Sequence, residues 1–116
     1  MSSGARARRI VKLKGNVPNS VSWIRLLEDG RIELEYFDRG AGSEDHFGGD
    51  VAWMYRVSAS DEPRLRGLLE KQANAAITDD RALLGTLAQA FPDAWAIRHW
   101  LREKGIRFEE EFDSWP

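Results

Sequence analysis

The clearest hydrophobic pattern lies in residues 21–38, where two runs of β-branched, aromatic and aliphatic residues flank Asp29 and Gly30. An Asp-Gly pair between two such runs is the strongest short-range signal of a β-hairpin, because both residues accept the positive φ that a two-residue loop of type I′ requires. We therefore expect an antiparallel pair with Asp29 and Gly30 as its loop, and we expect the rest of the fold to be built around it.

A two-residue loop also sets the pairing register of this hairpin. It places six residues on the more apolar face: Trp23, Arg25, Leu27, Ile32, Leu34 and Tyr36. The other face then carries Ile24, Leu26, Glu33 and Glu35. We expect the first face to cover the core, with the aliphatic stem of Arg25 along the core and its charged head at the edge.

Three further segments have the pattern of strands. Residues 10–14 predict a short edge strand whose lysines discourage unwanted pairing. Residues 51–57 alternate and predict a strand with its aromatic side chains directed inward. Residues 106–112 predict a last strand that returns to the sheet, and the alternative is an acidic tail over residues 109–113 that Trp115 and Pro116 close.

Between the last two of these strands the apolar positions change to helical spacing. Cap residues and early acids at 58–63 predict a helix that continues to about Ala76. A second start signal at 78–80 predicts a helix that Pro92 ends, and Asp93 opens a third that Gly105 stops. Strands first and helices later predict an α+β fold, with a mainly antiparallel sheet of three to five strands and three helices on one face.

Composition supports a single globular domain. The chain has 116 residues, of which 42% are hydrophobic and 31% are charged. We expect residues 1–8 to be a flexible basic arm and residues 9–116 to form the domain. The absence of cysteine excludes disulfides and thiolate chemistry. Neither a secretory signal nor an apolar stretch long enough for a bilayer is evident, so we expect a cytoplasmic protein and no membrane partner.

Charge is distributed unevenly along the chain. The first 27 residues contain six basic residues and no acidic one, whereas the remainder contains eleven basic and nineteen acidic residues. The basic residues of the N-terminal part that suggest nucleic-acid binding are Arg6, Arg8, Arg9, Lys12 and Lys14. We favour a solvated terminus over that alternative, because terminal charge runs are commonly disordered and no RNA-recognition signature is present.

The segment 39–50 carries four glycines and the best local constellation of residue types suited to a chemical site. Asp45, His46 and Asp50 combine an imidazole with two carboxylates, which is suited to a divalent metal or to acid–base chemistry. An Asp-His pair in a loop arises often by chance, however. We therefore expect no catalytic residue, metal or cofactor, and we keep a metal-binding or hydrolytic domain that uses these three residues as the alternative.

The most consistent expectation for function is a small, non-catalytic binding or protein-interaction domain whose partner is another protein or a second copy. The residues that we expect on its binding surface are Glu33, Glu35, Asp38, His46, Phe47 and Trp115. Trp115 is included because it has no periodic reason to be buried. We expect the other four tryptophans to pack in the core: Trp23, Trp53, Trp95 and Trp100.

Overall fold

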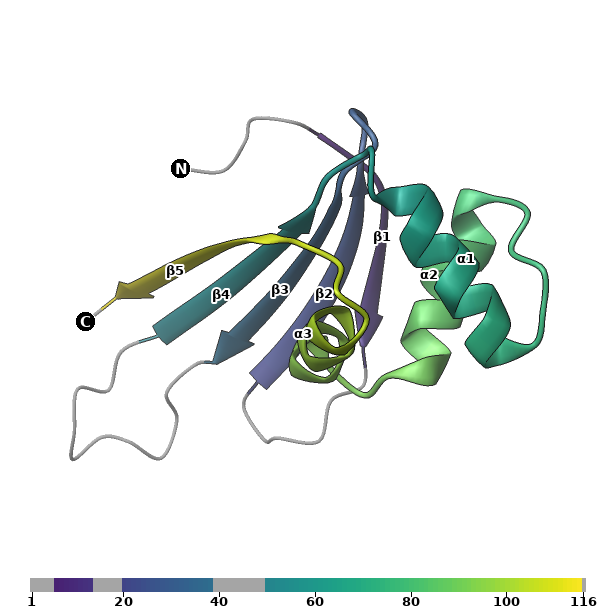
Figure 1. Cartoon of the computed structure of the whole chain (residues 1–116). Helices are drawn as coiled ribbons and strands as arrows, with labels where there is room; N and C mark the ends of the chain where they lie inside the picture. Colours follow the sequence, from purple (N-terminus) through teal and green to yellow (C-terminus); the bar gives the residue numbers. More distant parts are fainter. Residues whose placement is uncertain (1–5, 14–19, 39–49, 116) are drawn as a thin grey trace.

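The computed structural model describes residues 6–13, 20–38 and 50–115 (Figure 1). In these ranges the elements are β1 (Ala7–Leu13), β2 (Ser20–Leu27), β3 (Ile32–Asp38), β4 (Asp50–Val57), α1 (Glu62–Ala73), α2 (Asp80–Ala90), α3 (Ala94–Glu103) and β5 (Glu109–Trp115). The strands form one antiparallel sheet in the order β1-β2-β3-β4-β5, and the three helices, which all lie between β4 and β5 in the chain, cover one face. The predicted α+β fold is confirmed.

The turn between β2 and β3 differs from the predicted one. The Gly30 N–H donates to the Leu27 carbonyl (3.0 Å), and the Leu27 N–H donates to the Arg31 carbonyl (2.9 Å). Gly30 has φ +93°, whereas Asp29 does not have positive φ. This is the three-residue hairpin loop with a glycine at its left-handed position, so the prediction of a two-residue loop was wrong.

The longer loop shifts the register by one residue and reverses the two faces of β2. Ile24 now opposes Leu34, and Ile24 and Leu26 are buried beneath the helices. Trp23 and Arg25 lie on the opposite face of the sheet, so the prediction that they face the core was wrong. The physical reason is the two-residue period of a strand, in which a slip of one position moves every side chain to the other side.

Cap residues mark the starts of α2 and α3 and the end of α1. The side chains of Asp79 and Asp93 each accept a hydrogen bond from the backbone N–H three residues further on (2.7 and 2.9 Å), as N-cap residues do. Helix α1 ends at Ala73, earlier than predicted, because Asn74 adopts a left-handed conformation with φ 53°. None of the helices in the described ranges is both long and apolar enough to cross a membrane.

The two edge strands differ in their bounds from the predictions. Strand β1 begins at Ala7, so Ala7 and Arg8 belong to the sheet and not to the expected flexible arm. Strand β5 is confirmed against the alternative of an acidic tail, but it starts three residues late. The Ile106 N–H donates to the Leu101 carbonyl (2.9 Å), so the chain first caps α3 before it joins β4.

The helices and the sheet enclose one core. Helix α2 packs on β1 and β2, and α3 packs on β2 and β3. The Ala94 N–H at the start of α3 donates to the buried Ser22 hydroxyl (2.9 Å), which ties the helix to the sheet. Trp100 is buried and donates to Gln72 (2.7 Å), while Trp53 and Trp95 are half-buried at the core's margin. Packing is therefore confirmed for these three tryptophans and wrong for Trp23.

Replacing Gly30 tests the assigned turn. Gly30→Ala is expected to lower the free energy of unfolding by about 1–3 kcal/mol, because an L residue is strained at this φ. The added Cβ would also lie 3.0 Å from the Ala59 Cβ. The control Gly67→Ala adds a Cβ with nothing within 4 Å inside α1, and is expected to raise stability by about 0.5–1 kcal/mol. Urea denaturation measures the free energy of unfolding of both variants, and equal changes for Gly30→Ala and Gly67→Ala would contradict the assigned turn.

Candidate functional site

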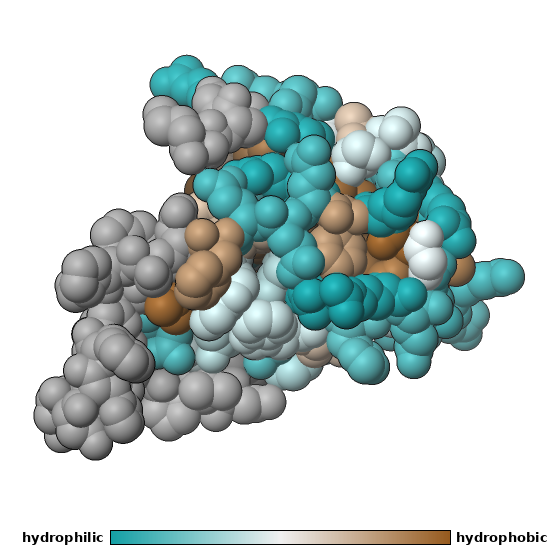
Figure 2. All heavy atoms as spheres, turned by 60° about the vertical axis from the view of Figure 1, so that its left-hand side comes forward, coloured by the Kyte–Doolittle hydropathy of each residue, from teal (hydrophilic) through white to brown (hydrophobic). Residues whose placement is uncertain are grey.

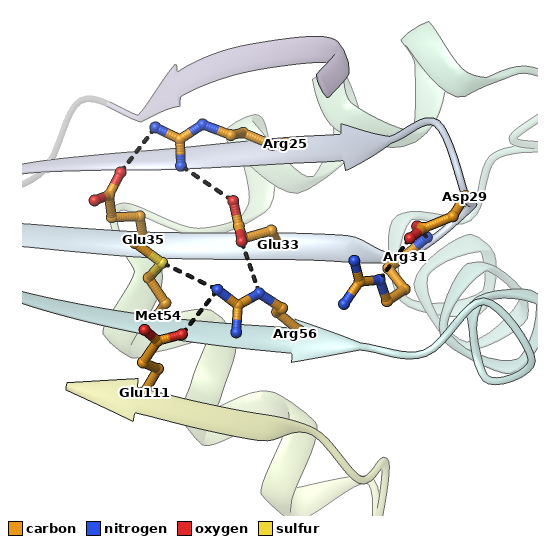
Figure 3. Close-up of polar contacts among 8 residues, drawn as sticks. All are labelled: Arg25, Asp29, Arg31, Glu33, Glu35, Met54, Arg56 and Glu111. Atoms are coloured by element: carbon orange, nitrogen blue, oxygen red, sulfur yellow. Dashed lines mark hydrogen bonds and ion pairs between the residues drawn. The ribbon is translucent and has the colours of Figure 1, made fainter. Parts of the chain in front are cut away.

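Alternating charges cross the sheet face that points away from the helices (Figure 3). We call this row the charge ladder, and its members in spatial order are Glu35, Arg25, Glu33, Arg56 and Glu111. The hairpin register produces it, because β2 places Arg25 opposite Glu33, and β4 places Arg56 opposite Glu33 from the other side. Opposite charges directly across strands stabilise a sheet.

The distances show that the ladder is well paired. Arg25 binds Glu35 at 2.8 Å and approaches Glu33 at 3.6 Å. Arg56 donates through Nε to Glu33 (2.8 Å), and its Nη2 lies 3.0 Å from Glu111. Glu33 and Arg56 are only 6% and 8% exposed, so the loss of either would leave the other buried with only its second partner, Arg25 or Glu111.

The ladder shifts the pKa of two of its members, Arg56 and Glu111. Burial by itself would lower the pKa of Arg56, but the hydrogen bonds to Glu33 and Glu111 outweigh it and raise that pKa. The hydrogen bond from Arg56 in turn holds the pKa of Glu111 below its ordinary value. Both shifts move the groups away from neutral pH, where a catalytic acid or base needs its pKa. The geometry therefore suits a structural role and not proton transfer.

The residues predicted for a binding surface have separate locations. Glu33 and Glu35 lie together in the ladder, where Arg25 and Arg56 largely balance their charge. Asp38 is half-buried at the end of β3. His46 and Phe47 lie outside the described residues. For Trp115, at the end of β5, the structure describes only the backbone, which pairs with Asp50 of β4.

The proposed metal or acid–base residues are also largely untested. Asp45 and His46 lie outside the described ranges, and Asp50 contributes its backbone to β4 while its side chain is not described. Among the side chains that the structure does describe, no three of His, Cys, Asp or Glu are grouped to hold a metal ion. His99 lies on the exposed surface of α3. The metal-binding and enzyme alternatives thus stay predictions.

A pocket of about 510 Å³ lies where the β2–β3 turn, the end of β4 and the start of β5 meet. Its charged lining residues are Arg31, Arg56, Arg107, Asp61 and Glu109. Arg31 is held by Asp29 (2.9 Å) and Arg56 by the ladder, which leaves Arg107 against the two acids Asp61 and Glu109. This pocket therefore offers no surplus of positive charge to an anion.

A second depression, which we call the basic groove, lies between β1 and α2 and has a volume of about 300 Å³. Its lining residues are Arg8, Arg9, Ile10, Val11, Arg81, Leu84 and Gly85, with no acid among them. Arg8 pairs with Asp80 at 3.0 Å. Arg9 and Arg81 are exposed and form no ion pair with any residue in the described part of the chain. Two arginines are therefore available to an incoming anion.

The groove follows the outer edge of the sheet. Four consecutive residues of β1, 8–11, line it, and since neighbouring side chains of a strand point to opposite faces, a depression that touches all four runs along the strand's edge. Strand β1 ends the sheet, so no described strand pairs with its outer backbone groups. Sequence reasoning identified Arg8 and Arg9 as a basic segment but missed Arg81, because only the tertiary fold brings α2 beside β1.

The buried pair of the ladder can be tested by a double-mutant cycle. Arg56→Leu leaves Glu33 buried without its closest partner, and is expected to lower the free energy of unfolding by about 3–5 kcal/mol. The double variant Arg56→Leu/Glu33→Leu is expected to be more stable than Arg56→Leu alone, because no uncompensated charge remains at the pair. Chemical denaturation of the two single variants and the double variant gives the coupling free energy between Arg56 and Glu33. Strictly additive losses in the free energy of unfolding would contradict a buried ion pair.

The pKa of Glu111 provides a second test, measured in the native chain and in the same double variant. Carboxyl NMR titration is expected to give a pKa below the ordinary 4.5 in the native chain and a higher one when Arg56 is replaced. Because the pKa of this carboxyl is lower in the folded state than in the unfolded state, it stabilises the fold at any pH above its unfolded-state pKa. This contribution is lost as the pH falls through the folded-state pKa. Arg107→Leu serves as control, and an unchanged Glu111 pKa in the double variant would refute the assignment.

No protein-family model, curated protein or solved structure matches this chain. Its function is therefore inferred from the residues and their geometry alone.

Proposed function

We propose that this protein is a non-catalytic protein-interaction domain, which binds an acidic, extended segment of a partner along the outer edge of β1. The observation that carries the proposal is the basic groove, in which arginines from β1 and α2 flank a strand edge that no described strand occupies. Strand addition suits such an edge, because backbone hydrogen bonds supply affinity while alternate side chains reach both sides.

The charge of the groove selects an acidic partner. Its lining contains three arginines and no acid, and Asp80 offsets only Arg8. Lys12 is exposed further along the same strand, with its ammonium 5.8 Å from the Trp23 ring. Basic groups at the rim of an interface attract an acidic segment and reject a basic one, and salt weakens the attraction.

The apolar residues of the groove favour a polypeptide over a nucleic acid. Ile10, Val11 and Leu84 lie among the arginines, and Ile10 is 56% exposed. A partner segment with an aliphatic or aromatic residue among its acids would bury these side chains. Single-stranded nucleic acids, by contrast, bind mainly by stacking bases on aromatic rings, and no aromatic residue lines this groove.

Space in the groove comes partly from Gly85. This residue lies in the interior of α2, where glycine destabilises a helix by about 1 kcal/mol relative to alanine. A Cβ added there would meet nothing within 4 Å. A larger side chain at this position therefore narrows the groove without disturbing the core.

Binding can be measured by fluorescence anisotropy with a labelled peptide of alternating Glu and Val, and with a Lys–Val peptide as the matched probe. The acidic peptide is expected to bind the full chain more weakly as salt is added, and the basic peptide is expected not to bind. Arg9→Glu/Arg81→Glu is expected to weaken binding by about tenfold or more, since two attractive charges become repulsive. Arg107→Glu, a charge reversal outside the groove, is expected to have a much smaller effect.

A steric variant separates the groove from general electrostatics. Gly85→Leu is expected to weaken binding of the acidic peptide although it changes no charge, whereas Gly67→Leu on α1 is expected to leave that binding unchanged. Equal affinities for Gly85→Leu and the native chain would refute the groove. Tight binding of a single-stranded oligonucleotide without binding of the peptide would refute a protein partner and favour the nucleic-acid alternative.

A further inference from the structure

We infer that the acidic segment that the basic groove accepts is strand β5 of a second copy of this chain. This inference rests on the proposed function and names the partner of the same site. The two edges of the sheet are β1 and β5, which lie at its opposite sides (Figure 1). Between them they carry complementary charge, since β1 contains three basic residues and no acid, and β5 contains four acids and no basic residue.

The apolar residues of the two edges also match. Ile10 and Phe112 are the two large hydrophobic side chains that remain mostly exposed in the described ranges, at 56% and 53%. Ile10 lies near the middle of β1, and Phe112 near the middle of β5. Elsewhere on the β5 side of the molecule, apolar side chains of the described residues form only small, separate areas in a hydrophilic surface (Figure 2). Each edge thus offers one apolar contact within a charged strand.

The faces on which these side chains lie determine how two copies fit. Ile10 opposes Arg25 on the face away from the helices, whereas Phe112 opposes Trp53 on the helix-covered face. Antiparallel addition of β5 to the outer edge of β1 turns the second copy over, and this brings Phe112 to the side of Ile10. In that arrangement Glu109, which is on the other side of β5, points to the side of Arg9 and of helix α2 with Arg81.

The charges also exclude the symmetric alternatives. Pairing of β1 with β1 would bring arginines together, and pairing of β5 with β5 would bring glutamates together, so each like pairing is repulsive. The contact is therefore heterologous, and each added copy leaves one free β1 and one free β5. Within their own copy Glu110 binds Arg98 (2.8 Å) and Glu111 binds Arg56, which reduces the charge available and makes the association weak and reversible.

Analytical ultracentrifugation of the full chain tests this inference. At low salt the average mass is expected to increase with protein concentration beyond that of a dimer, and high salt is expected to reverse the increase. Two variants block one edge each: Arg9→Glu/Ile10→Glu blocks β1, and Glu109→Gln/Phe112→Asn blocks β5 without giving it a positive charge that the altered β1 would attract. All four substituted side chains are exposed, so the fold is expected to tolerate them, which circular dichroism verifies.

Mixing the two variants gives the decisive result. Each alone is expected to stay monomeric, whereas the mixture is expected to form a 1:1 dimer and to stop there, because only one compatible pair of edges remains. A monomeric native chain at all concentrations, or a mixture that stays monomeric, would overturn the inference.

The β5-blocked variant keeps the basic groove and is expected to bind the acidic peptide. If this variant binds the peptide but the native chain does not self-associate, only this inference is overturned. If the native chain does not bind the peptide, the proposed function itself is overturned.

Discussion

The architecture depends on the register of the β2–β3 hairpin, and that register depends on one left-handed residue, Gly30. With a loop of three residues, Ile24 and Leu26 enter the core and Arg25 joins the opposite face beside Glu33 and Glu35. The alternative register would bury an arginine beneath the helices without a carboxylate opposite it, which is strongly unfavourable. Turn geometry, apolar burial and charge pairing therefore agree on one register, as expected for a sequence with little frustration.

Electrostatics divide this sheet into a face and two edges. On the face, Arg25 and Arg56 each meet two carboxylates within 3.6 Å, so their charges are balanced within the molecule. At the edges, Arg9 and Glu109 have no ion-pair partner among the described residues. Edge strands usually carry charge to prevent pairing with other chains. Here the two edges carry opposite signs, so the same device that prevents like edges from pairing allows unlike edges to attract each other.

Local signals made most of the fold predictable. The Asp-Gly pair marked the hairpin, the aspartates before α2 and α3 marked their starts, and alternation marked β4. The register was not predictable, because an Asp-Gly pair fits both a two-residue loop and a three-residue loop with glycine last. The sequence around β5 predicted a strand, but it did not show that the chain first caps the end of α3, so that the strand begins three residues later than predicted. The ladder and the basic groove were missed for a different reason: Arg56 and Arg81 reach their neighbours only after strands and helices distant in sequence have packed together.

The position of the helices between β4 and β5 has a consequence for the order in which the domain assembles. Strands β2 and β3 are joined by only a few residues, whereas roughly fifty residues separate Val57 from Glu109. Closing a loop of that length costs more conformational entropy than closing a short turn, and the helical layer shortens the gap only once it has folded. The strand that completes the sheet is thus the one whose pairing depends most on structure formed beforehand, and until it docks, the inner edge that it will occupy on β4 stays open.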